Sequence, residues 1–205
     1  MSSGHQQNVT ETEATQVLRL FIAVQVPEEI KAEMEKAQSQ LRRALPEAAV
    51  RWSKREQFHL TLRFLGSVKR PRLAPLLDAL RGACQDFVAL KLRAKDLGFF
   101  PSQRVPRVIW AGVADALDQL PRLQKAVQSA SADFTGEKPE EKFSGHITLG
   151  RVKNLNRSQS AALVDAASRA ERDFGEWVAN EICLMESRLS PQGAIHSVVA
   201  PVPLA

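Results

Sequence analysis

Apolar and polar residues recur along the chain at two spacings, one typical of strands and one typical of helices. The run from Leu18 to Val24 is almost continuously apolar and stops before Pro27, so it predicts a largely buried strand. A helix is expected next, because Pro27 sets the dihedral of a first helical turn and the acids Glu28 and Glu29 suit its positive end. One apolar stripe marks the buried face of that helix: Ile30, Met34, Ala37, Leu41 and Leu45.

The rest of the chain continues this mixture of elements at irregular intervals. An alternating stretch that ends at Gly66 predicts a second strand, and helices are expected to begin near Pro71, Leu117 and Ser158. Because helices do not follow every strand, the order favours an α+β fold with antiparallel-rich sheets over a doubly wound parallel sheet. The remaining expected strands cover residues 89–97, 108–113, 143–152, 178–188 and 194–202.

Length and composition are those of an ordinary globular enzyme, since the chain has 205 residues of which 44% are hydrophobic and 25% charged. The length fits one domain or two small, closely packed lobes, and we expect a disordered tail over residues 1–17 followed by this single unit over residues 18–205. The tail lacks the basic and apolar segments of a signal peptide, and no apolar run approaches the roughly 20 residues that span a bilayer. The expected location is therefore the cytoplasm, with no membrane contact.

Charge and cysteine content narrow the class of function. The formal net charge of +5 modestly favours a polyanionic partner such as nucleic acid, although such an excess also serves solubility alone. Cys84 and Cys183 lie far apart and form no C-x-x-C pair, so neither a disulfide framework nor a zinc knuckle is indicated.

A tetrapeptide of the form His-x-Thr-x occurs twice, as His59-Leu60-Thr61-Leu62 and as His146-Ile147-Thr148-Leu149. On a strand, the histidine and threonine of each copy share one face and the two aliphatic residues share the other. Two such faces can line one cleft between similar lobes. One imidazole then serves as base and the other as acid on a phosphodiester, while the hydroxyls hold the non-bridging oxygens, without metal or cofactor. The motif itself allows either histidine to take either role.

Alternative roles for these residues are less well supported. One such motif alone is poor evidence, because alternating polar and apolar residues describe any half-exposed strand. Zinc needs three or four ligands, and beyond the motif pair the chain offers only His5, His196 and dispersed cysteines and acids. The sequence also lacks the G-x-S-x-G elbow of a serine hydrolase, a P-loop and a dinucleotide fingerprint.

The two motifs and the segments around them resemble the two-histidine phosphoesterase superfamily, specifically the RNA 2′,3′-cyclic phosphodiesterases that are also described as 2′,5′ RNA ligases. The resemblance covers nearly the whole chain, and its segments are residues 19–24, 27–30, 51–52, 59–66, 98–101, 106–113, 146–151 and 184–189. It implies a bilobal α+β fold whose two pseudo-symmetric lobes, with outer helices, surround a central cleft. It also implies hydrolysis of a terminal 2′,3′-cyclic phosphate to a 2′-phosphate, and reversible 2′,5′ ligation.

The same resemblance implies residue roles and partners. His59 matches the proton donor and His146 the proton acceptor, while Thr61 and Thr148 match the positions that hold the phosphate. Arg151 matches a basic position after the second motif, although a solvated strand end is the alternative. The implied partners are RNA 3′ ends or nucleotides with a cyclic phosphate, and no obligate protein partner is evident.

Two residues depart from the family's pattern. Gly145 stands where proline is usual, which predicts a looser backbone before the second histidine. His196 stands where the last strand commonly has tyrosine. It either contacts the substrate or occupies a surface position of that strand, and we expect the surface position.

Further arginines and aromatic residues are candidate RNA contacts. Phe21 is expected either to stack on a base or to pack in the core, while Trp110 is expected in the core. The other candidates are Arg51, Arg55, Arg63, Arg104, Arg107, Trp52 and Phe100. Two other functions remain open, namely an RNA- or nucleotide-binding module without turnover and a phosphodiesterase for 2′,5′-oligonucleotides or small cyclic phosphates.

Overall fold

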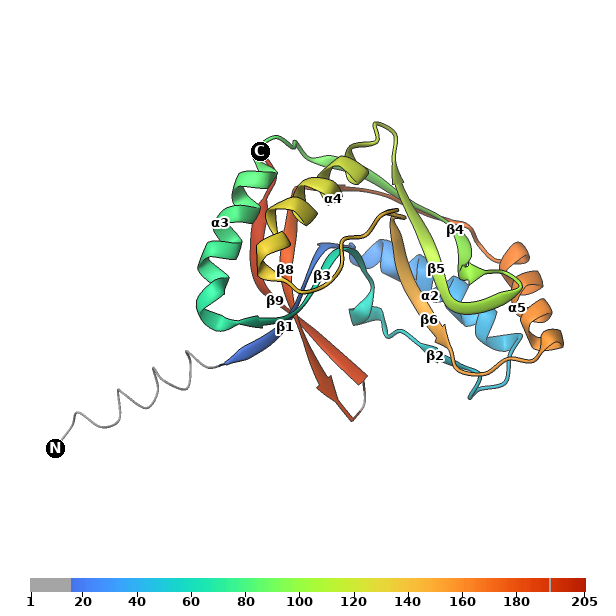
Figure 1. Ribbon diagram of the computed structural model, residues 1–205. Coiled ribbons are helices and arrows are strands. Elements are labelled where there is room, and N and C mark those ends of the chain that lie inside the picture. The colour runs from blue at the N-terminus through green and yellow to red at the C-terminus, as the bar shows by residue number, and fades with distance from the viewer. Residues whose placement is uncertain (1–15, 192) are drawn as a thin grey trace.

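The computed structural model describes residues 16–191 and 193–205 (Figure 1). The strands are β1 (Val17–Gln25), β2 (Val50–Trp52), β3 (His59–Lys69), β4 (Leu90–Ser102), β5 (Val105–Asp115), β6 (His146–Val152), β7 (Asp173–Ala179), β8 (Glu181–Ser190) and β9 (Gly193–Pro203). The α-helices in the described part are α2 (Glu28–Arg43), α3 (Leu73–Cys84), α4 (Gln119–Ala130) and α5 (Arg157–Arg169), and the 3-10 helices are η1 (Arg55–Gln57), η2 (Arg70–Arg72) and η3 (Ala132–Phe134). The tail expected over residues 1–17 lies outside the described residues up to residue 15, and β1 begins at Val17.

The strands form one antiparallel sheet in the order β7-β4-β5-β6-β3-β1-β8-β9, with β2 paired to β6 beside this path. We call β7, β4, β5 and β6 arm A, and β3, β1, β8 and β9 arm B. The arms join where β6 and β3 pair, at Ile147 and Leu60. Four strands of this path therefore lie on each side of the junction, with β2 in addition beside β6, and the α+β fold with two pseudo-symmetric, antiparallel lobes predicted from the sequence is confirmed.

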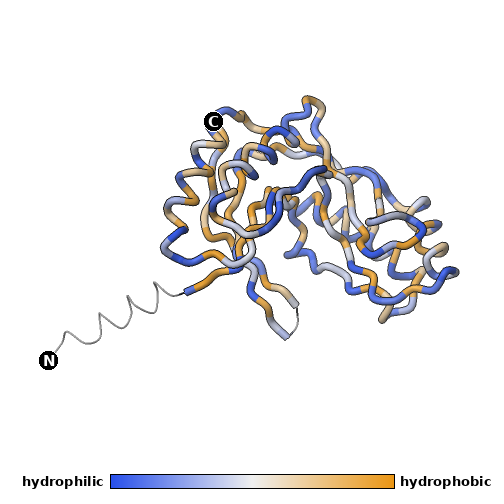
Figure 2. The backbone as a smooth tube through the Cα atoms, in the orientation of Figure 1, coloured by the Kyte–Doolittle hydropathy of each residue, from blue (hydrophilic) through white to orange (hydrophobic). Residues whose placement is uncertain are grey.

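Helices cover the outer face of each arm. Helices α2 and α5 pack on arm A against β7 and β4, and helices α3 and α4 pack on arm B against β9 and β3 (Figure 1). Figure 2 shows apolar residues gathered along the strands and alternating with polar residues along the helices. This pattern places one main core between the sheet and the helices, because both elements turn their apolar face inward.

One stretch of strand differs from the sequence-based expectation. The strand expected over residues 178–188 is two strands, β7 and β8, and β7 begins at Asp173. A bulge at Gly175, which has a φ of 106°, places Phe174 and Trp177 together on the buried side of β7 although they lie three positions apart. The bulge breaks the two-residue period that marks a strand, so the pattern of apolar residues did not indicate β7.

None of the helices in residues 16–191 and 193–205 is long and apolar enough to cross a membrane.

Candidate active site

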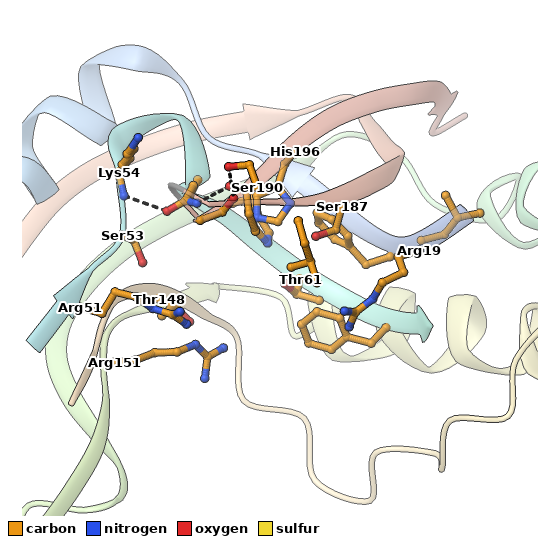
Figure 3. Close-up of a pocket in the computed structure, with 18 of the residues that line it drawn as sticks. Arg19, Arg51, Ser53, Lys54, Thr61, Thr148, Arg151, Ser187, Ser190 and His196 are labelled. Carbon is orange, nitrogen blue, oxygen red and sulfur yellow. Dashed lines mark hydrogen bonds between the residues drawn. The ribbon is translucent and has the colours of Figure 1, made fainter. Parts of the chain in front are cut away.

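A cavity of about 770 Å³ is lined by residues of both arms. His59 and Thr61 enter it from β3, and His146 and Thr148 enter it from β6. Figure 3 shows Thr61 and Thr148 on different walls of this cavity, with Arg151 near Thr148. The structure thus brings together the four residues of the two motifs, which are far apart in the sequence.

The alternation of the two strands explains how the motif residues meet. Leu60 and Ile147 are fully buried and lie directly opposite one another across the β3–β6 junction. Their neighbours on each strand point to the other face of the sheet, toward the cavity. Extending the antiparallel register by one residue on each side places His59 opposite Thr148 and His146 opposite Thr61. Two imidazoles and two hydroxyls therefore surround the junction of the arms.

His59 is the more enclosed of the two histidines. Its ring lies 4.8 Å from the ring of Phe21 and 5.2 Å from the ring of His196, measured between centroids. Burial lowers the pKa of His59 to about 4, and the positive charges of His196, His146 and Lys31 act in the same direction. A hydrogen bond with the backbone of Gln57 opposes this change. With this pKa, His59 is neutral at pH 7.

The ring of His146 is held by the backbone just before β6. Its Nδ1 lies 2.7 Å from the carbonyl oxygen of Ser144, two residues earlier in the chain. That carbonyl accepts a hydrogen bond from the Nδ1–H, so the neutral ring carries its lone pair on Nε2. The aromatic rings of Phe100 and Trp110 stand beside it, at centroid distances of 5.0 and 6.3 Å. A ring fixed in this tautomer is suited to accept a proton at Nε2.

Gly145 lies in a tight place rather than in a loose one. A Cβ added to it would be 2.5 Å from the carbonyl oxygen of Val113 and 3.1 Å from Cδ2 of Leu120. Its own carbonyl accepts a hydrogen bond of 2.8 Å from the N–H of Val113. The expectation of a looser backbone before His146 is therefore wrong, because a residue without a side chain is what lets this segment approach β5 closely.

Arg51 and Arg151 form a basic wall of the cavity. They are cross-strand partners on β2 and β6, both side chains are exposed, and both line the cavity. Within the described residues, neither guanidinium has a hydrogen-bond or ion-pair partner. Like charges directly opposite one another destabilise a sheet. A bound anion would offset the repulsion between the two guanidinium groups, so this pair suits an anionic ligand.

The other arginines considered from the sequence lie elsewhere. Arg63 is 7% exposed and donates hydrogen bonds of 2.6 Å to the carbonyl oxygens of Lys138 and Glu137. Arg55 pairs with Glu28 at 2.9 Å on the surface, and the exposed Arg104 and Arg107 do not line the cavity. The idea that Arg63 guides RNA is wrong, because its charge is used to hold the segment before β6.

The aromatic candidates divide into three positions. Trp52 lines the cavity, with the guanidinium of Arg42 over its ring at 5.5 Å. Phe21 also lines it but is only 2% exposed, so it offers little free surface and its stacking on a base stays a prediction. The ring of Phe100 contacts the ring of His146 edge-on, with the centroids 5.0 Å apart. Trp110 is half-buried next to His146 rather than in the core as expected, since β5 turns it to the same face as that histidine.

The sequence-based interpretation of His196 is wrong as well. This residue lines the cavity beside His59 instead of occupying a surface position. Sequence reasoning also missed several other residues of the lining, among them Arg19, Lys54, Gln57, Phe64 and Ser187. The pairing of Ser187 with His196 across β8 and β9 follows from the hairpin around Pro191, which was a usable signal.

Within the described residues, no group of three or more histidine, cysteine, aspartate or glutamate side chains is placed to hold a metal ion.

Comparison with known protein sequences points to one family. A family described as LigT-like phosphoesterase matches residues 24–110 and 112–196, so each matched segment contains one of the two motifs. An RNA 2′,3′-cyclic phosphodiesterase of Methanocaldococcus jannaschii is 32% identical over 183 residues, which are 89% of this chain and 98% of that protein. The protein of the same description from Archaeoglobus fulgidus is 31% identical over 87% of this chain and 96% of its own length.

Solved structures agree on the fold. A protein from Thermus thermophilus superposes with a TM-score of 0.74 at 28% identity, covering 91% of this chain and 98% of its own. Escherichia coli LigT superposes with a TM-score of 0.72 at 22% identity, covering 93% and 99% of the two chains.

Proposed function

This chain belongs to the LigT-like phosphoesterase family and is a hydrolase, and on that basis we propose that it converts 2′,3′-cyclic phosphodiester ends of RNA to 2′-phosphomonoesters. The observation that carries the proposal is the convergence of His59, Thr61, His146 and Thr148 on one cavity. The relatives named as RNA 2′,3′-cyclic phosphodiesterases support the choice of substrate.

The reaction needs one proton acceptor and one proton donor. A water molecule attacks phosphorus as His146 Nε2 takes its proton, and the bond from phosphorus to the 3′-oxygen breaks as His59 protonates that oxygen. The hydrogen bond from His146 Nδ1 to Ser144 supports the acceptor role, because it leaves the lone pair on Nε2. Thr61 and Thr148 donate to the non-bridging oxygens, and Arg151 offsets the charge that develops on them. The step requires no metal ion or cofactor.

The protonation of His59 depends on the substrate. With a pKa of about 4, His59 lacks the proton that a donor must carry at pH 7. A bound phosphodiester places a negative charge beside the ring and raises that pKa. The donor is therefore charged mainly in the enzyme–substrate complex.

A 5′-hydroxyl in place of the attacking water converts the same chemistry into 2′,5′ ligation.

Product analysis tests the proposal. Phosphorus NMR distinguishes a cyclic phosphate from 2′- and 3′-monoesters, so it reports turnover and regiochemistry together. With EDTA present, we expect a 2′-monoester from a cyclic nucleotide and from a short RNA that ends in a cyclic phosphate. His59→Ala and His146→Ala should each lower kcat by about 10²- to 10⁴-fold. Unchanged turnover in either variant contradicts the mechanism.

The alternative functions have distinct outcomes in the same experiment. Tight binding of a nucleotide with no product after long incubation indicates a binding module. Product from 2′,5′-oligonucleotides or small cyclic phosphates, with none from cyclic RNA ends, indicates a different substrate for the same reaction mechanism. Cytoplasmic location and the absence of an obligate protein partner stay predictions from the sequence.

A further inference from the structure

A third histidine stands against His59. His196 lies on β9, and its ring meets the ring of His59 edge-on, with centroids 5.2 Å apart and an interplanar angle of 77°. The ring of Phe21 closes the group, 5.0 Å from His196 and 4.8 Å from His59. The three rings therefore pack as one cluster at the wall of the cavity.

The cluster makes the two pseudo-symmetric histidines unequal. Among the described residues, the rings in contact with His146 are those of Phe100 and Trp110, and neither of them takes up a proton near neutral pH. His59 has one aromatic ring and one imidazole. The difference between the two motif copies is thus a titratable ring in direct contact with His59.

Part of His196 has no partner. Its Nδ1 is buried and makes no hydrogen bond within the described part of the chain. A buried polar atom without a partner costs free energy, so the position of this ring against His59 calls for an explanation.

The segment before His59 ties β9 to the catalytic strand. The side chain of Gln57 donates a hydrogen bond of 2.5 Å from Nε2 to the carbonyl oxygen of Ala194, and its Oε1 accepts one of 2.9 Å from the backbone N–H of Lys54. The backbone of Gln57 also bonds to His59. One residue therefore sets the position of His59 relative to the strand that carries His196.

We propose that His196 is a positioning residue for His59, which holds the His59 ring edge-on and admits only one positive charge to the pair until a phosphate binds. The proposal rests on the proposed function, in which His59 transfers a proton. It assigns to the departure from the usual tyrosine a role in setting the pH range of the reaction.

The charges around His59 and His196 support the limit of one positive charge on the pair. The positive charges that act on His59 come from His196 on β9, His146 on β6 and Lys31 on α2. The uncharged neighbours are Phe21 of β1, whose ring contacts His59, and Ser187 of β8, which lies opposite His196. Burial lowers the pKa of His196, and burial together with the positive charge of His196 lowers the pKa of His59 to about 4. A proton on His196 therefore opposes protonation of His59 while the two rings lie in contact.

Three variants separate charge from shape. His196→Phe keeps a ring against His59 and removes the charge, His196→Tyr restores the usual family residue, and His196→Gln removes the ring. Ile195→Ala is the matched control, because Ile195 is the neighbouring residue on β9, is 60% exposed and does not line the cavity. Circular dichroism and a thermal melt identify any variant that does not fold.

The first readout needs no catalysis. Nitrogen-15 NMR follows the titration of the His59 ring in the substrate-free protein. We expect its midpoint to rise by up to about one pH unit in His196→Phe and in His196→Tyr, and to stay unchanged in Ile195→Ala. An unchanged His59 midpoint in both folded ring variants overturns the proposal, whether or not the protein hydrolyses cyclic phosphates.

The second readout is the pH profile of kcat/KM for a cyclic nucleotide. If His59 is the donor, the raised pKa in His196→Phe increases kcat/KM at alkaline pH, because more of the free enzyme carries the proton, whereas His196→Gln also lowers kcat because the ring contact is lost. A loss of kcat/KM at acid pH, with no gain at alkaline pH, supports the positioning role and reverses the assignment of donor and acceptor. Absence of turnover in the wild type, with the NMR shift present, contradicts the proposed function alone.

Discussion

Replacing Gly145 by alanine tests how closely the segment before His146 must approach β5. A Cβ at this position would lie 2.5 Å from the carbonyl oxygen of Val113, well inside the contact distance of a carbon and an oxygen. The backbone of Val113 cannot move freely, because its N–H is bonded to the carbonyl of Gly145 at 2.8 Å. Relief of the clash therefore requires a shift of several tenths of an ångström in the segment that carries Ser144 and His146.

Two effects of known size follow from that shift. Overpacking of this kind costs about 1–3 kcal/mol of the free energy of unfolding, which lowers Tm by about 3–9 °C in a domain of this length. A catalytic group displaced by up to about 1 Å loses up to about 10²-fold in rate. We expect Gly145→Ala to lower kcat/KM by about 10- to 100-fold. Gly145→Pro should do the same, because its ring also begins at the crowded Cβ.

The measurements are a thermal melt and phosphorus NMR turnover of a cyclic nucleotide. Gly82→Ala is the matched control: a Cβ there meets no atom within 4 Å, and Gly82 lies in α3, so alanine should stabilise the protein by about 0.5–1 kcal/mol. Wild-type stability and turnover in Gly145→Ala would refute the close-approach argument. Lost stability with full turnover would refute only the link to His146.

The remaining predictions concern pH, charge and the hydroxyls. Because the pKa of His59 falls from 6.5 to about 4 on folding, the unfolded chain binds more protons between these values, so the free energy of unfolding should decrease as the pH drops from 6.5 to 4. Urea denaturation at several pH values measures this slope, which should be smaller in His59→Phe than in the wild type. Equal slopes in the wild type and in His59→Phe would show that His59 does not cause the pH dependence. Arg51→Gln should raise KM for a cyclic-ended oligonucleotide about 10-fold and reduce its salt dependence, with little change for a cyclic mononucleotide. Arg151→Gln should impair both substrates, and equal losses from the two variants on both substrates would contradict the division. Thr61→Val and Thr148→Val should each lower kcat about 10- to 100-fold in steady-state assays, with thermal melts near that of the wild type.

Local pattern was sufficient to predict the fold class and the faces of the two motif strands. Side chains alternate along a strand whatever surrounds it, so the spacing in His59-Leu60-Thr61 already separates the buried leucine from the two polar groups. The same argument holds at Ile147. The bulge at Gly175 shows the limit of this reasoning, because one inserted residue removes the period by which a strand is recognised.

The sequence alone thus determined which residues share a face, since that depends on bond geometry within a few positions. Which faces meet depends on how distant strands pair in the folded protein. The pairing of Leu60 with Ile147 brings the two motifs to one cavity, and the return of β9 along β8 brings His196 to His59. The burial of Arg63 and the tight fit of Gly145 also depend on segments far away in the chain. Such contacts arise from packing between distant elements, whose register no local pattern encodes.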